Sequence, residues 1–172
     1  IHWNFSPVLD LARDPRWPRF WETFGEDPHL VATMGRAIVD GYQNSGVPFA
    51  ATLKHFFGYG FSLSGKDRTP AWIPERQLRE YFLPPFQTAI ESGAMSIMVN
   101  SGEINGIPVH SNKALLTDLL RDELGFEGLL VTDWEDVKYL FTRHMIAHDY
   151  KEATKMAIEA GIDMAMVPMD LK

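Results

Sequence analysis

Residues 128–134 have the sequence GLLVTDW, in which an apolar run ends abruptly in Asp133 and Trp134. Apolar and β-branched residues in unbroken succession predict a short strand that is buried on both faces, as in a parallel sheet. In α/β barrels and open α/β sheets, functional groups gather at the carboxyl ends of such strands. Asp133 is therefore a candidate functional carboxylate. The alternative is that it caps the helix expected over residues 135–141, because aspartate is a favoured N-cap.

The rest of the chain alternates between predicted strands and predicted helices. Strands are expected over residues 4–9, 51–56, 95–99, 128–133 and 163–167, and helices over 28–46, 74–91 with an interruption at Pro84-Pro85, 115–124, 135–141 and 149–160. This alternation indicates βαβ units and a parallel sheet. We expect an α/β fold, a partial (β/α)8 TIM-like barrel of about five strand–helix units, with an open doubly wound sheet as the alternative. The chain contains neither the dinucleotide-binding pattern G-x-G-x-x-G after a strand nor the phosphate-binding pattern G-x-x-x-x-G-K-[ST]. Nothing in the sequence therefore favours nucleotide binding.

The length and composition narrow the function classes. The chain has 172 residues, whereas a complete eight-fold barrel takes roughly 250. We therefore expect residues 1–172 to be an internal segment of a barrel domain, with the first and last parts of the barrel missing and no internal domain boundary. The net charge of −7 gives no support for nucleic-acid binding, and no apolar run of about 18 residues predicts a membrane span. There is no cysteine, no histidine spacing typical of a metal site, and no reason to expect a cofactor.

Several polar and aromatic residues follow the predicted strands. Lys54 and His55 end the second strand, and charges in a buried strand are costly unless they are paired. Neighbouring residues of a strand face opposite sides, so both side chains reach one mouth only if this strand is irregular. Arg19 and Arg68 lie in the loops after the first and second strands. Trp17, Trp21 and Trp72 also lie in loops, where ordinary packing is favoured over a sugar-stacking role for each.

The chain resembles the barrel domain of glycoside hydrolase family 3, and it is most similar to the β-glucosidase and exo-β-glucanase branch. The likeness covers nearly the whole chain in order: residues 4–30 (NFSPVLDLARDPRWPRFWETFGEDPHL), 52–60 (TLKHFFGYG), 65–86 (GKDRTPAWIPERQLREYFLPPF), 96–110 (SIMVNSGEINGIPVH), 115–133 (LLTDLLRDELGFEGLLVTD) and 160–168 (AGIDMAMVP). The combination of these stretches is specific, whereas no single one would be.

The resemblance implies a retaining β-glycosidase that removes terminal, non-reducing β-D-glucose from β-glucosides or β-glucans. Asp133 matches the family's nucleophile and Trp134 the aromatic beside it. Lys54, His55 and Arg19 match residues that contact the terminal sugar, and Arg68 falls in a loop that often adds a polar contact. Two departures are Pro18, where the family usually has glycine, and Ser101, where many members have a tyrosine.

The resemblance also implies what this segment lacks. In this family the acid/base commonly comes from a later domain, so the expected partners are the substrate and the remainder of the same enzyme. The isolated segment should neither fold well nor turn over substrate. A secreted or periplasmic location follows from the polysaccharide-degrading role.

Two other functions remain open. The first is a β-N-acetylglucosaminidase of the same family, although residues 58–68 (GYGFSLSGKDR) lack the histidine that those enzymes carry there. The second is a non-catalytic barrel fragment that binds glycan or packs against a partner chain.

Overall fold

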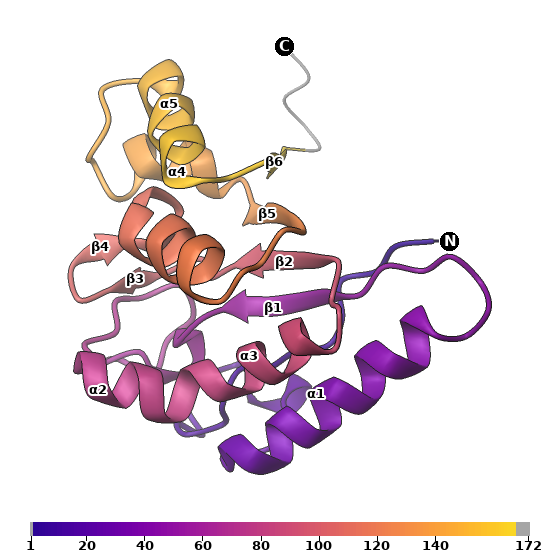
Figure 1. The fold of residues 1–172 in the computed structure, drawn as a ribbon. Helices are drawn as coiled ribbons and strands as arrows, with labels where there is room; N and C mark the ends of the chain where they lie inside the picture. The colour runs from indigo at the N-terminus through magenta and orange to yellow at the C-terminus, as the bar shows by residue number, and fades with distance from the viewer. Residues whose placement is uncertain (1, 168–172) are drawn as a thin grey trace.

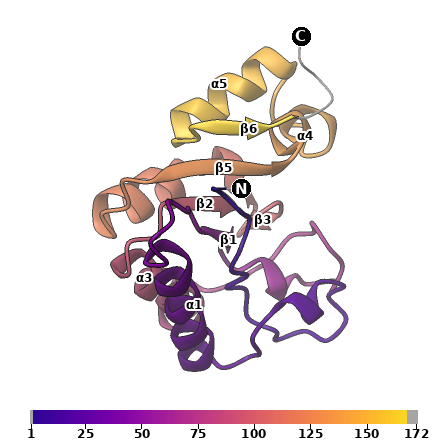
Figure 2. The ribbon, with the colours of Figure 1, turned by 90° about the vertical axis from the view of Figure 1, so that its right-hand side faces the viewer.

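Four strands form one parallel sheet in the computed structural model of the chain, which describes residues 2–167. They are β1 (Thr52–Phe56), β2 (Ser96–Val99), β5 (Leu129–Trp134) and β6 (Met164–Met166), and they lie in the order β1-β2-β5-β6. Figure 2 shows them stacked in this order. Segment 3–9 runs parallel to the free edge of β1, where Pro7 O accepts the Lys54 N–H at 3.0 Å and Leu9 N–H donates to Lys54 O at 2.6 Å. The strand expected over residues 4–9 is thus extended and paired, but as isolated bridges.

The strand order decides between the two expected architectures. From segment 3–9 to β6, each new strand is added on the same side of the previous one. An open doubly wound sheet instead reverses its strand order at a switch point. Sequential addition without reversal is how a (β/α)8 barrel is built. The partial barrel is therefore confirmed.

Helices α1 (Pro28–Gln43) and α3 (Leu83–Glu91) pack side by side against one face of the sheet (Figure 1). The Asp27 side chain caps α1, as predicted, by accepting the N–H of His29 at 2.7 Å. The buried contact between these helices and β1 includes Val39, Phe86 and Leu53. At the β6 end of the sheet in Figure 1, α4 (Asp136–Thr142) and α5 (Tyr150–Ala160) follow β5 in the chain, while a π-helical segment, Ala114–Glu123, precedes β5.

The predicted break at Pro84-Pro85 is wrong. Helix α2 (Glu75–Gln77), a π-helical segment (Leu78–Phe82) and α3 follow one another without a gap. Leu83 N–H donates to the carbonyl of Leu78, five residues earlier. A proline inside a helix lacks the N–H and needs room near the carbonyl four residues before it. The widened turn directly before the two prolines supplies that room, so the helix continues.

The expected loop over residues 100–110 contains a short antiparallel hairpin. Its strands are β3 (Glu103–Ile104) and β4 (Ile107–Pro108). Asn105 and Gly106 make the turn with positive φ angles of 52° and 84°, the conformation of a two-residue hairpin turn.

Across residues 2–167, none of the helices has the length and apolar character needed to span a membrane.

Candidate active site

Asp133 lies at the carboxyl end of β5, buried with 8% of its surface exposed. Its Oδ1 accepts the N–H of Trp134 at 2.6 Å, and its Oδ2 accepts the Ser101 hydroxyl at 2.9 Å. Helix α4 begins at Asp136 with Glu135 as its N-cap residue, and that cap makes no side-chain hydrogen bond. Asp133 is therefore not a helix cap, which leaves the functional interpretation of this carboxylate.

Two guanidinium groups and one imidazole surround this carboxylate from three different parts of the chain. Arg19 Nη1 and His55 Nε2 each lie 3.7 Å from Asp133 Oδ2, and Arg68 Nη2 lies 3.5 Å from Oδ1. Burial by itself would raise the pKa of Asp133, but the charge of His55, the Trp134 N–H and Arg68 together lower the pKa below its ordinary value. The carboxylate is therefore ionised at neutral pH.

The end of β1 is irregular at Lys54 and His55. The pairing of β1 with β2 shifts register between Leu53 and Phe56, and the Lys54–His55 peptide bond is cis. His55 is buried and points at Asp133, while Lys54 is half-buried beside the same groups. Burial, then the nearby Arg19, lowers the pKa of Lys54 against the opposing charges of Glu22 and Asp133. Among residues 2–167, the Lys54 ammonium has no ion-pair partner within 4 Å, so it is available to an added ligand.

A buried carboxylate, Asp10, holds His55 from behind, and the sequence did not predict this pairing. Asp10 Oδ2 accepts the His55 Nδ1–H at 2.8 Å and the His55 backbone N–H at 3.0 Å. With Nδ1 so engaged, the other ring nitrogen faces Asp133. Asp10 ends the first predicted strand, so its position was a signal, but nothing in the sequence pairs it with His55.

Arg68 reaches the site from the loop after β1 with a positive φ of 56°. Its Nη1 donates to Asp136 Oδ1 at 2.6 Å and approaches the Trp134 carbonyl at 3.4 Å. The guanidinium thus contacts carboxylates of two successive elements, Asp133 near the end of β5 and Asp136 at the start of α4. Asp136, which is 2% exposed, is a second buried acid that the sequence analysis did not single out.

The tryptophans differ from one another. Trp134 is half exposed at the mouth, and Trp17 is buried and donates from Nε1 to Asp67 at 3.1 Å. Trp21 and Trp72 are 88% and 58% exposed, so the packing expected for these two is wrong in the described chain.

No group of three or more histidine, aspartate or glutamate side chains within residues 2–167 is arranged to hold a metal ion.

A carboxylate kept ionised at the mouth of a parallel α/β barrel can attack an electrophilic carbon or accept a proton, and this fold and site are those of an α/β-barrel enzyme domain. More narrowly, the chain belongs to glycosyl hydrolase family 3: the family model described as "Glycosyl hydrolase family 3 N terminal domain" matches residues 1–172.

Similar proteins carry two activities in their names. A lysosomal beta glucosidase of Dictyostelium discoideum is 51% identical over 99% of this chain and 22% of its own length. A beta-xylosidase of Formosa agariphila is 44% identical over 95% of this chain and 24% of its own length. The crystal structure of a beta-glucosidase from Listeria innocua superposes with a TM-score of 0.92 at 40% identity, covering 97% of this chain and 24% of that one. The chain thus spans about a quarter of the length of each of these relatives.

Proposed function

We propose that the full-length protein is a retaining β-glycosidase that removes terminal, non-reducing β-D-glucose, with Asp133 as its nucleophile. The observation that carries the proposal is the ionised Asp133 carboxylate within 3.7 Å of both Arg19 and His55. A retaining mechanism uses a carboxylate nucleophile and a second carboxyl group as acid/base, about 5–5.5 Å apart. Asp136 is tied to Arg68 and Ser101, so we assign the acid/base to a part of the enzyme outside this segment.

We propose that Lys54, His55 and Arg19 bind hydroxyl groups of the terminal glucose and that Trp134 offers it an apolar face. Lys54 supports this with an ammonium that has no ion-pair partner among residues 2–167, and Trp134 with its half-exposed indole. Hydrogen bonds to the sugar that strengthen toward the oxocarbenium-like transition state would accelerate the reaction. Arg68 is shared between Asp133 and Asp136, which supports a role in holding the nucleophile as much as a contact with the sugar.

The test is the Asp133→Ala variant of the full-length enzyme assayed with an activated aryl β-glucoside and azide. Removing the nucleophile should abolish turnover, and azide should restore it by attacking from the vacated face to give the α-glucosyl azide. Asp118→Asn is a matched control, because Asp118 is an exposed acid on the Ala114–Glu123 segment. Hydrolysis by Asp133→Ala at the rate of the control would rule out this function.

A β-xylosidase is a second candidate, favoured by the name of the Formosa agariphila relative. Xylose differs from glucose in lacking the exocyclic hydroxymethyl group, so the two substrates report whether that group is bound or excluded. The ratio of kcat/KM for nitrophenyl glucoside and nitrophenyl xyloside separates the two activities. The N-acetylglucosaminide belongs in the same series, as the substrate of the family's other branch.

We further propose that the full-length protein acts outside the cytoplasm, as a secreted or periplasmic enzyme. The lysosomal name of the Dictyostelium discoideum relative supports a location away from the cytosol. Detection of full-length protein in the culture medium or in a periplasmic extract would test this.

A further inference from the structure

The buried carboxyl groups of Asp133 and Asp136 both contact one hydroxyl group, that of Ser101. The Ser101 Oγ lies 2.9 Å from Asp133 Oδ2 and 2.5 Å from Asp136 Oδ2. Ser101 is 2% exposed, Asp136 2% and Asp133 8%. Both contacts are within the range of O–H···O hydrogen bonds, and the shorter one falls in the range typical of a charge-assisted bond.

The number of protons does not suffice if both acids are ionised. A serine hydroxyl has one hydrogen to donate, and an ionised carboxylate has none. With two ionised partners, one of the two short contacts would bring together two oxygen lone pairs in a buried, weakly screened place, which is unfavourable. One additional proton makes both contacts hydrogen bonds. The geometry therefore requires one of the two carboxyl groups to be protonated.

The surroundings place that proton on Asp136. Asp133 faces Arg19, His55 and Arg68 and also accepts the Trp134 N–H, all of which favour its charged form. Asp136 faces one cation, Arg68, together with the negative charge of Asp133. Burial, the largest effect, raises the pKa of Asp136 to about 7 despite Arg68 and Ser101.

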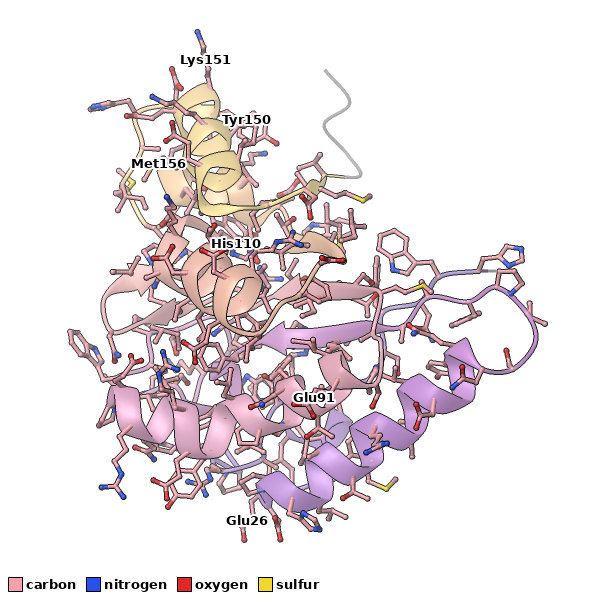
Figure 3. All side chains as sticks on the ribbon, in the orientation of Figure 1. Glu26, Glu91, His110, Tyr150, Lys151 and Met156 are labelled. Atoms are coloured by element: carbon pink, nitrogen blue, oxygen red, sulfur yellow. The ribbon has the colours of Figure 1, made fainter. Side chains whose placement is uncertain are left out.

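A further titratable neighbour of Asp136 is His110, which Figure 3 labels in the interior near α4 and α5. Its Nε2 lies 3.6 Å from Asp136 Oδ2, too far for a hydrogen bond, and has no hydrogen-bond partner among the described residues. Burial lowers the pKa of His110 to about 3. A neutral imidazole provides no counter-charge that would favour an ionised Asp136.

We propose that Asp136 is a positioning residue that stays protonated in the resting enzyme and donates to Ser101, which in turn donates to the nucleophile Asp133. Arg68 Nη1 donates a hydrogen bond to Oδ1 of Asp136. The protonated oxygen is therefore Oδ2, which faces Ser101. The chain of donors fixes Asp133 Oδ2 in place and leaves its negative charge intact. This inference rests on the proposed function, in that Asp133 is taken as the nucleophile.

The test compares Asp136→Asn with Asp136→Ala in the full-length enzyme. An asparagine amide can donate to Ser101 and still accept from Arg68, so it imitates a protonated acid and not an ionised one. We expect kcat of Asp136→Asn within roughly threefold of wild type at pH 6, and kcat of Asp136→Ala lower by about ten- to a hundredfold with little change in KM. Ser101→Ala should match Asp136→Ala. Equal losses in Asp136→Asn and Asp136→Ala would overturn the proposal.

A second measurement decides the location of the proton whatever the substrate is. Difference infrared spectra of wild type against Asp136→Asn should contain the carbonyl band of a protonated carboxylic acid at pH 5–6, and the band should fade as the pH rises through about 7. Absence of that band at pH 5–6 would refute a protonated Asp136, even if the enzyme hydrolyses glucosides. Presence of the band in a protein without glycosidase activity would instead retain the protonated acid and reject the proposed function.

Discussion

Asp10 accepts two hydrogen bonds from His55, one from the ring Nδ1 at 2.8 Å and one from the backbone N–H at 3.0 Å. Both residues are almost fully buried. The two bonds anchor the imidazole at its ring and at its backbone, so the remaining ring nitrogen faces Asp133. The position of His55 relative to the proposed nucleophile therefore depends on Asp10, a second carboxylate on the opposite side of the imidazole ring.

Replacing Asp10 by asparagine should reduce activity without removing the fold. The substitution keeps the shape but replaces the charged acceptor of the two His55 hydrogen bonds by a neutral amide. A buried hydrogen bond to a charged group is worth about 1.5–3 kcal/mol, so kcat/KM of Asp10→Asn should fall by about ten- to a hundredfold. Steady-state kinetics on an aryl glucoside measure this, with Asp118→Asn as the exposed control. An Asp10→Asn variant with the kinetics of that control would show that the contact is dispensable.

Arg68 should set the acid limb of the pH–rate profile. Arg68 helps to lower the pKa of Asp133, and the nucleophile is active in its ionised form, above that pKa. In Arg68→Met this favourable charge is lost, so the pKa of Asp133 rises and the acid limb of kcat/KM moves to higher pH. In Arg68→Lys the charge remains but the fork that contacts both Asp133 and Asp136 is lost, so the limb should move less. An acid limb at the same pH in Arg68→Met as in wild type would contradict this.

Asp136 should make the stability of the enzyme depend on pH. Its pKa is raised from 3.8 to about 7, so the folded state favours the neutral acid. That contribution is fully present below the unfolded-state pKa, near 3.8, and is lost as the pH rises through about 7. Each pH unit in that window is worth about 1.4 kcal/mol, or of the order of 4 kcal/mol in total. The Asp136→Asn variant carries no such dependence.

The Tm of Asp136→Asn relative to wild type should therefore increase between pH 4 and pH 7 and level off above pH 7. Thermal unfolding of both full-length proteins over this pH range measures the difference. Asp118→Asn, which replaces an exposed acid, should follow wild type at every pH. A constant difference between Asp136→Asn and wild type from pH 4 to pH 8 would show that Asp136 titrates alike in the folded and unfolded states.

Much of the fold could be predicted from the sequence because local patterns determine it. The apolar run before Asp133 predicts the buried strand, Asp27-Pro28 predicts the start of α1, and alternation predicts the parallel sheet. The irregular end of β1 was expected from the conflict between Lys54 and His55 in a buried strand. The hairpin was missed although Asn105-Gly106 is a strong turn signal, because its two strands, Glu103–Ile104 and Ile107–Pro108, are too short to show an alternating pattern.

The candidate site was predictable only in part. Residues that end a strand, such as Asp133, His55 and Trp134, carry a positional signal, and the family resemblance selected among them. Asp136 carries no such signal, since it looks like an ordinary acid in the first turn of a helix. Its importance comes from Arg68 and Ser101, which are 68 and 35 residues away in the chain. Contacts of this kind depend on tertiary packing and are not encoded in local spacing.

Glycine at position 128 should be required for the packing of β5, whereas glycine at position 41 should not. A Cβ at Gly128 would collide with the backbone carbonyl of Met95 and with the Phe126 ring, while a Cβ at Gly41 would meet nothing within 4 Å. Because a backbone atom cannot move aside cheaply, Gly128→Ala should destabilise the protein by about 1–3 kcal/mol. Gly41→Ala, on the exposed side of α1, should stabilise it by about 0.5–1 kcal/mol, since alanine loses less backbone entropy in a helix. Thermal or denaturant unfolding of the two full-length variants measures these opposite changes in the free energy of unfolding. A Gly128→Ala protein as stable as Gly41→Ala would show that the contact between β2 and β5 adjusts more easily than the packing indicates.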